Sequence, residues 1–290
     1  MNVQTLSPTT AQDPAGTARP PALSGRLILL DELRGLTLIS MILYHFMWDL
    51  YYIVGITFPW KYGMYAPGMH IWQQSICWTF ILLSGFCWSL GHHPFRRGMI
   101  VFGCGLVVTA VTVLFVPEYL ILFGVLTLIG SSMLFMIPFD FVLKRLIGLR
   151  TTRDSAEEPE HTAGRAPIMA LLMTALFFAL FWWTLHHGQT LWPQSFPRNL
   201  LTTYLGFPFA GFWSTDYFSV IPWFFLYVTG YLLHAVTVTL RLPETFRARL
   251  QDIAHTSHLP ALAFLGRHCL LVYMLHQPVL YGIACVVAYI

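Results

Sequence analysis

Charged side chains are scarce in this chain of 290 residues, because Asp, Glu, Lys and Arg together make up only 10% of it. A soluble globular domain carries about 25% charged residues. Hydrophobic residues account for 56%, and the mean hydropathy is +0.63. These values exclude an ordinary soluble enzyme and predict a single all-α polytopic membrane domain. We expect the lipid bilayer as a partner, and no nucleic acid.

Several common site motifs are also missing. The five cysteines form no CxxC pair, so we expect free thiols rather than disulfides or a metal centre. GxSxG, P-loop and dinucleotide-binding fingerprints are absent. No metal is expected, because HxxxD at 45–49 supplies only two ligands on one helix.

Long apolar stretches fill most of the remaining chain. A spanning helix needs about 20 mostly apolar residues. Seven stretches meet that length and predict a bundle of about seven transmembrane helices. They are 34–55, 68–90, 98–116, 119–143, 167–187, 218–240 and 267–289.

The Lys and Arg residues predict the orientation of this bundle. If the N-terminus is inside, the inner segments hold 14 of the 16 Lys and Arg residues, and the outer segments hold only Lys61 and Arg198. Cytoplasmic loops collect Lys and Arg. We therefore expect a cytoplasmic N-terminus and, with seven spans, an extracytoplasmic C-terminus.

The remaining segments divide the chain into parts. Residues 1–24 lack the basic and apolar regions of a signal peptide, and we expect a disordered cytoplasmic tail. Residues 25–290 form one transmembrane domain. Within it, 151–166 reads as a mobile cytoplasmic linker and 188–217 as an extracytoplasmic loop. In this loop, 195–215 is half apolar and predicts a short interfacial or re-entrant helix. Residues 243–256 predict a short surface helix that begins at Pro243.

The first span carries ionisable residues where lipid-facing residues would be apolar. It opens with DELRGLTLISMILYHFMWDL at 31–50. At about 100° per residue, Arg34 and His45 fall about 20° apart around the helix, and Asp49 lies one turn beyond His45. The stripe therefore runs from Arg34 at the cytoplasmic edge through His45 to Asp49. Such a stripe predicts a polar interior rather than a lipid contact.

Two interpretations of this stripe stay open. In the functional one, His45 is a general base, and Asp49 fixes its tautomer and stabilises the imidazolium. In the structural one, the pair forms a buried hydrogen bond that ties helices together. His276 lies beside Gln277-Pro278 in the last span and has the same two interpretations. It is either a site residue or the partner in a hydrogen bond at a helix kink.

Four stretches resemble one known family. Arg34 and His45 are separated by ten residues, as in integral-membrane acyltransferases that acylate extracytoplasmic glycans. The wider stretch LDELRGLTLISMILYHFMWDL resembles the opening of the bacterial family related to the heparan-alpha-glucosaminide N-acetyltransferase catalytic domain. Three later segments are similar as well: ILFGVLTLIGSSMLF at 121–135, TDYFSVIPWFFLYVTGYLL at 215–233 and LGRHCLLVYMLHQPVLYGI at 265–283.

The chain departs from the pattern of this family at two positions. Thr127 stands where the family pattern suggests His, and Cys269 stands where it suggests Ser. The first change removes a titratable group and leaves the role of that position open.

The resemblance implies acyl transfer across a membrane, in a multi-pass protein of a bacterial inner or plasma membrane. The donor would be cytoplasmic acyl-CoA, with acetyl-CoA as the expected form. The acceptor would be an extracytoplasmic glycan, through a sugar hydroxyl or amine, or another small molecule. CoA is a polyanion, so Arg34, Arg96 and Arg97 at the basic cytoplasmic mouth are candidates for binding its phosphates. For the two loop arginines, the alternative is a topology signal alone.

The resemblance also assigns candidate roles at the site. His45, Asp49 and Arg34 are the catalytic candidates, with either direct transfer or an acyl-His45 intermediate. Asp216 lies outside as an acceptor contact, with Trp223, His276 and Gln277 as further substrate-binding candidates. Tyr44, Gln277 and Trp223 are available as oxyanion donors.

Other functions remain possible from the sequence. A proton-coupled transporter or a lipid or acyl flippase would use the His45 and Asp49 pair as a proton relay. Against it, the chain shows no paired inverted repeats. A non-catalytic membrane assembly subunit would leave the charged stripe unused. The sequence leaves a homodimer open.

Overall fold

The computed structural model describes residues 26–58, 62–148, 166–190, 193, 195, 197–240 and 243–289. Within this part the chain is helical without strands, so the all-α prediction is confirmed. A helix of 20 or more residues lies in each of the seven predicted stretches. These helices are α1 (Ile28–Tyr52), α2 (Pro67–Phe86), α3 (Pro94–Phe115), α4 (Val125–Ile147), α5 (Ala166–His187), α7 (Val220–Thr239) and α10 (Cys269–Tyr289).

Five of these helices are long and apolar enough to cross a membrane by length and composition: α3, α4, α5, α7 and α10. The described chain is therefore that of a multi-pass membrane protein. Helices α1 and α2 are as long but more polar. Asp31, Glu32 and Arg34 open α1, whereas His70, Gln73 and Gln74 lie in the first half of α2. That polarity matches the prediction that the first span lines a polar interior.

Short helices occupy the connections. They are η1 (Gly63–Tyr65), η2 (Pro117–Tyr119), η5 (Gly188–Thr190), α6 (Leu200–Leu205), α8 (Glu244–His255) and α9 (Pro260–Arg267). Helix α6 confirms the short helix expected in the outer loop, and α8 begins directly after Pro243, as predicted. Helix α9 was not predicted. The expected tail at 1–24 and most of the linker at 151–166 lie outside the described residues.

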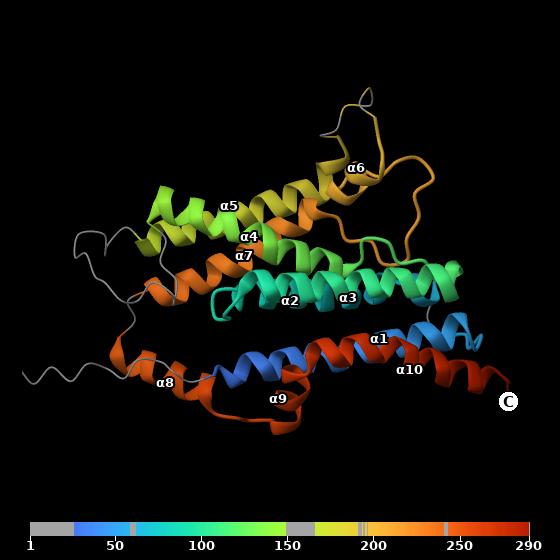
Figure 1. Ribbon diagram of the computed structural model, residues 1–290. Helices are drawn as coiled ribbons and strands as arrows, with labels where there is room; N and C mark the ends of the chain where they lie inside the picture. The colour runs from blue at the N-terminus through green and yellow to red at the C-terminus, as the bar shows by residue number, and fades with distance from the viewer. Residues whose placement is uncertain are drawn as a thin grey trace, which may run out of the picture.

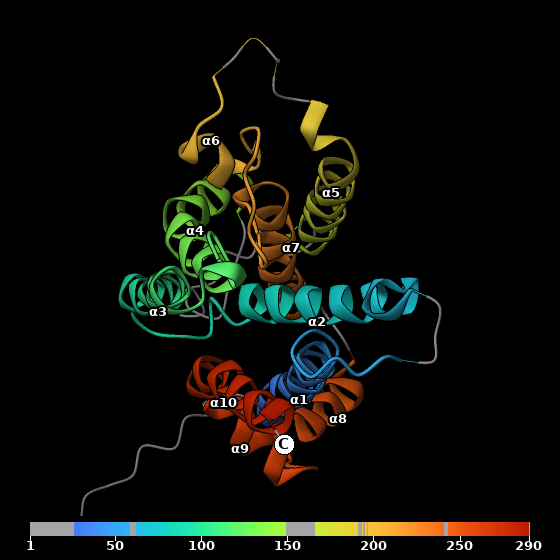
Figure 2. The ribbon, with the colours of Figure 1, turned by 90° about the vertical axis from the view of Figure 1, so that its right-hand side faces the viewer.

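Most of the long helices run along a common direction in Figure 1, whereas α2 lies across them in Figure 2. Two groups of helices lie on opposite sides of α2 and α3. Helices α4, α5 and α7 lie on one side of α2 and α3, and α1, α8, α9 and α10 lie on the other. The start of α1 and α8 lie at one end in Figure 1, whereas the end of α10 and α6 lie toward the other. The segments predicted to be inside and outside thus sort to opposite ends of the bundle.

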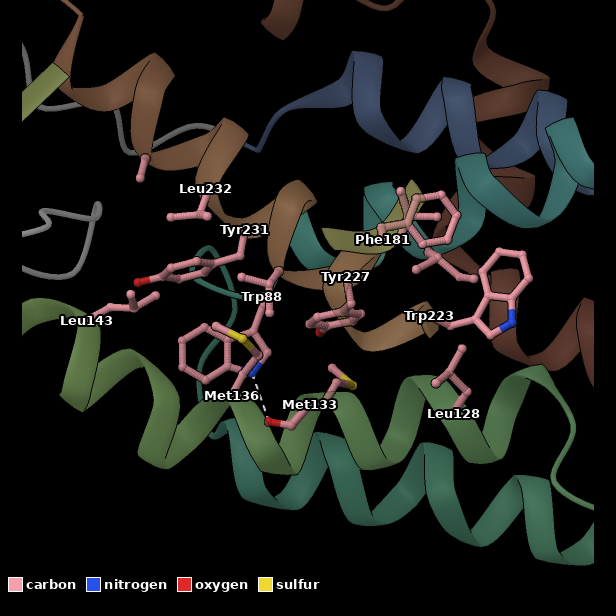
Figure 3. Close-up of a cluster of buried hydrophobic side chains, with 14 of the residues drawn as sticks. Trp88, Leu128, Met133, Met136, Leu143, Phe181, Trp223, Tyr227, Tyr231 and Leu232 are labelled. Atoms are coloured by element: carbon pink, nitrogen blue, oxygen red, sulfur yellow. Dashed lines mark hydrogen bonds between the residues drawn. The ribbon is translucent and has the colours of Figure 1, made fainter. Parts of the chain in front are cut away.

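The main hydrophobic core joins α2, α4, α5 and α7 (Figure 3). Tyr227 and Tyr231 of α7 are fully buried in it. The indole N–H of Trp88 donates a hydrogen bond to the Met133 carbonyl of α4 at 3.0 Å. Helices α2 and α7 approach closely, because a Cβ on Gly230 would lie 2.2 Å from the Leu82 carbonyl oxygen. Small residues allow such close packing between membrane helices.

A second core holds the site helix. Leu38, Met41 and Tyr44 of α1 pack with Met69 and Ile76 of α2. Helix α1 also packs along α9 and α10. One face of α1 is thereby fixed against α10, and this face carries the polar stripe.

Candidate active site

The centre of the site lies where α1 meets α10. Because α1 is continuous from Ile28 to Tyr52, His45 and Asp49 stand one above the other, as their spacing predicts. The His45 ring lies against the His276 ring of α10, with ring centroids 5.0 Å apart and planes tilted by 57°. The structure thus brings two predicted site histidines together from opposite ends of the sequence.

The buried carboxylate of Asp49 is held from α10. Only 2% of Asp49 is exposed. The side-chain amide of Gln277 donates to both of its oxygens, at 3.1 and 3.4 Å. The side chain that contacts Asp49 is therefore Gln277, whereas the His45 ring faces His276. Since a buried carboxylate without a donor would be costly, this contact fixes α1 against α10.

His276 is itself oriented by its own helix. Its Nδ1 lies 2.5 Å from the carbonyl oxygen of Tyr273. Within the described residues, neither His276 Nε2 nor Gln277 Oε1 has a hydrogen-bond partner, although both atoms are buried. Buried polar atoms are usually hydrogen-bonded, so these two are available to a substrate or a neighbouring group.

Aromatic rings of α1 and α2 border this region. Tyr44 lies edge-on to His45 at 5.9 Å and edge-on to Trp72 at 5.5 Å. The Trp72 indole donates to the Ser40 hydroxyl at 2.8 Å. Of the three predicted oxyanion donors, Tyr44 is the one in ring contact with His45.

At the predicted cytoplasmic end of α1, three arginines surround one carboxylate. Asp31 is buried and lies 2.5 Å from Arg26, 3.2 Å from Arg34 and 4.0 Å from Arg267. Asp140, near the inner end of α4, lies 3.1 Å from Lys144 on its own helix.

The second predicted basic element, expected in the loop 91–98, lies in the first turn of α3. Arg96 is exposed and Arg97 is partly buried. The Arg97 guanidinium packs over Gly91, because a Cβ on Gly91 would lie 1.6 Å from Arg97 Nη1. Arg34 and Arg97 both lie within electrostatic range of Cys87 at the end of α2. Arg34 and Arg97, which are distant in sequence, thus both influence the same thiol electrostatically.

The outer candidates Asp216 and Trp223 lie apart from this centre. Asp216 Oδ2 accepts the backbone N–H of Val125 at 3.2 Å, which satisfies a free donor at the start of α4. Burial raises the pKa of Asp216 to about 6, although the Val125 hydrogen bond acts in the opposite direction. Asp216 also lies within electrostatic range of Tyr273 in α10.

Trp223 belongs to the main core. Its ring lies 4.9 Å from Phe218 and 5.5 Å from Phe181 (Figure 3). A pocket of about 160 Å³ lies nearby between α5, α6 and α7. It is lined by Thr184, Leu185, Gly188, Gly206, Phe207, Ser219, Ile221 and Pro222.

Thr127, which replaces a histidine of the expected pattern, is a buried packing residue. It is 3% exposed, and its hydroxyl would lie 2.6 Å from a Cβ on Gly105 of α3. The close approach of α3 leaves little room there for an imidazole. In the part of the chain that is described, no group of three or more His, Cys, Asp or Glu side chains could hold a metal ion.

Some contacts of the site were not predicted from the sequence. Asp31 stands three residues before Arg34, and that spacing on a helix could have predicted their ion pair. The contacts of Trp72 with Ser40 and of His276 with His45 join different helices. Spacing along one helix could not have predicted them.

Comparison with known proteins gave one family match. A family model described as "Heparan-alpha-glucosaminide N-acetyltransferase, catalytic" matches residues 26–150 and 161–278. These ranges include all the site residues predicted from the sequence. Neither a curated protein nor a solved structure matched the chain.

Proposed function

The chain belongs to the heparan-alpha-glucosaminide N-acetyltransferase catalytic family, and we propose that it carries an acetyl group across a membrane. The donor is acetyl-CoA on the cytoplasmic side, and the acceptor is a sugar hydroxyl or amine on the other side. Membership of this family supports an acetyltransferase-like enzyme. The donor, the acceptor, the direction and the roles of the residues are parts of the proposal.

The observation that carries the proposal is the contact of His45 with His276 beside the buried Asp49. It joins a titratable ring, a second ring and a carboxylate inside the helix bundle. Intramembrane ionisable groups of this kind usually serve function rather than packing. The family is an acetyltransferase family, and acetyl transfer needs a base at the acceptor.

In the proposed reaction, His45 is the general base. It takes the proton from the acceptor hydroxyl or amine as that oxygen or nitrogen attacks the thioester carbonyl carbon. The carbon–sulfur bond then breaks, and the CoA thiolate leaves and takes the proton back from His45. Asp49, one turn away on α1, stabilises the positive charge that His45 holds in between. An acetyl-His45 intermediate remains the alternative order of steps.

The arginines at the inner end are proposed to bind the phosphates of the donor. Arg34 and Arg97 both influence the Cys87 thiol electrostatically, and Arg96 is exposed in the same turn as Arg97. Guanidinium groups bind phosphate bidentately and keep their charge when partly buried. Asp31 holds Arg34 in place through their 3.2 Å contact. Arg34 therefore acts at the donor entrance, at the inner end of the helix that carries His45.

The acceptor is proposed to enter from the outer end. There Asp216 lies within electrostatic range of Tyr273, whose carbonyl binds His276. Gln277 faces the same region through its contact with Asp49. Since Asp216 also caps α4 and Trp223 packs in the core, we assign these two to the walls of the acceptor side. His276 and Gln277 are the nearer contacts.

The test is turnover of radiolabelled acetyl-CoA by the full chain in lipid nanodiscs, with glucosamine as the probe acceptor. We expect the wild type to release CoA, and His45→Ala to slow release at least about 100-fold, since it removes the base. His186→Ala is the matched control, because His186 is exposed on α5 and should leave the rate unchanged.

Two results would sink the proposal: a wild type that binds no acetyl-CoA, or turnover that survives His45→Ala. The transporter alternative predicts something different. A carrier that uses His45 and Asp49 as a relay would acidify sealed vesicles without consuming the thioester.

A further inference from the structure

The hydrogen bond of His276 fixes which of its nitrogens carries a proton. Nδ1 lies 2.5 Å from the Tyr273 carbonyl oxygen. A carbonyl oxygen can only accept, so Nδ1 must donate. In a neutral imidazole the other nitrogen is then an acceptor. His276 Nε2 is therefore a buried lone pair, and it has no hydrogen-bond partner among the described residues.

The His276 ring lies against the ring of His45, which belongs to another helix. The two ring centroids are 5.0 Å apart and the planes are tilted by 57°, so the rings are not stacked. Ring nitrogens lie off the centroid, and this separation leaves room for an N–H···N hydrogen bond of about 2.9 Å. His45 can supply the N–H that His276 lacks.

The other candidate partner of His45 is already engaged. Asp49 accepts the Gln277 amide through both oxygens. Two consecutive residues of α10 thus contact different side chains of α1. Gln277 binds the Asp49 carboxylate, and His276 faces the His45 imidazole. Two buried acceptors lack a partner among the described residues, His276 Nε2 and Gln277 Oε1. His276 is the one whose ring contacts His45, so we assign the orientation of His45 to it.

We propose that His276 is the positioning residue of His45, accepting its N–H and thereby leaving the other His45 nitrogen free to take a proton. This inference rests on the proposed function. When His45 takes the acceptor's proton, the imidazolium still donates to His276, and the proton returns to the CoA thiolate. His276 itself gains and loses no proton.

Two substitutions separate positioning from a helix-stabilising role. His276→Gln places an amide oxygen near the position of Nε2 and so keeps the acceptor. His276→Asn places an amide N–H near the position of Nδ1 and so keeps the bond to Tyr273. If His276 positions His45, the His276→Gln variant should retain kcat within about threefold of the wild type. The kcat of His276→Asn should fall at least about tenfold. The KM for acetyl-CoA should stay unchanged in both.

An active His276→Asn variant together with an inactive His276→Gln variant would overturn the proposal and favour a structural role of His276. Equal activity of both variants with the wild type would overturn it as well. Thermal unfolding of each variant verifies that both fold.

A second measurement does not depend on turnover. Nitrogen NMR of ¹⁵N-histidine-labelled full-length protein in nanodiscs reports the tautomer of His45. We expect one neutral tautomer in the wild type and in His276→Gln, and a mixture in His276→Asn. An unchanged His45 signal in all three would contradict the positioning role even if acetyl-CoA proved not to be the substrate. An inactive wild type with the expected tautomers would contradict only the proposed function.

Discussion

Asp216 shows how one side chain can hold the start of a helix in place. Its carboxylate is the cap of α4, which has no side-chain cap at Gly124. Burial raises its pKa to about 6 from 3.8. The folded protein therefore binds this proton more tightly than the unfolded chain does between these two pH values. The contribution of Asp216 to stability is present below about pH 4 and is lost as the pH rises through about 6.

This predicts a pH dependence that a single substitution removes. The wild type should lose thermal stability between pH 4 and 7 relative to Asp216→Asn, because the amide oxygen still accepts the Val125 N–H but carries no charge. The measurement is the unfolding midpoint of both proteins in detergent across that range. A constant difference between them would show that Asp216 does not titrate there.

Gly91 predicts a change in donor binding without a change in fold. A methyl group there would lie 1.6 Å from Arg97 Nη1, at the flexible end of that side chain. Gly91→Ala should therefore move the guanidinium and raise the KM for acetyl-CoA about tenfold, the size of one charge-assisted hydrogen bond. Gly68→Ala, with open space around it, is the control. An unchanged KM of Gly91→Ala for acetyl-CoA would contradict the assignment of Arg97 to the donor site.

Among the elements, α9 decides how α1 is placed. A Cβ on Gly266 would lie 1.8 Å from the backbone oxygen of Asp31, and one on Gly35 would lie 2.1 Å from that of Leu262. Glu32 also accepts two backbone N–H groups of the turn before α9, at 2.8 Å each. Helix α9 is thus held directly against the turn of α1 that carries Arg34.

Gly266→Ala should therefore destabilise the protein by about 1–3 kcal/mol, because backbone rather than a flexible side chain must move. Turnover should fall as well, since the arginine cluster at Asp31 would shift. Gly103→Ala is the matched control, because it lies in a long helix with nothing within 4 Å. The two unfolding midpoints in detergent provide the test, and equal midpoints would count against the close α1 and α9 contact.

The elements also show what the sequence could predict. Apolar length located all seven long helices, with ends that differ by at most six residues, because a membrane helix must satisfy its backbone internally. The shared face of Arg34, His45 and Asp49 followed from helix geometry alone. Helix α9 was missed because its eight residues are too short for an apolar window and run into α10. The pairing of His45 with His276 was not predictable, since it depends on which helices become neighbours.

At the scale of the whole molecule, the bundle has two ends with different chemistry. Arg26, Arg34 and Arg267 surround Asp31 at the start of α1, whereas Asp216 caps the start of α4. His45 lies about three turns along α1 from Arg34. The proposed function follows from this order, because an anionic donor would meet the base from the arginine end and an acceptor from the other. The acetyl group alone would then need to pass the base, and CoA would stay on its own side.

The most direct measurement uses sealed proteoliposomes of the full chain with glucosamine inside. The outside receives acetyl-CoA that carries ¹⁴C in the acetyl group and ³H in the CoA. The account predicts that ¹⁴C accumulates inside as acetylated glucosamine while ³H stays outside, and that His45→Ala abolishes this accumulation. Entry of both labels together would contradict it, because the protein would then be a carrier of intact acetyl-CoA.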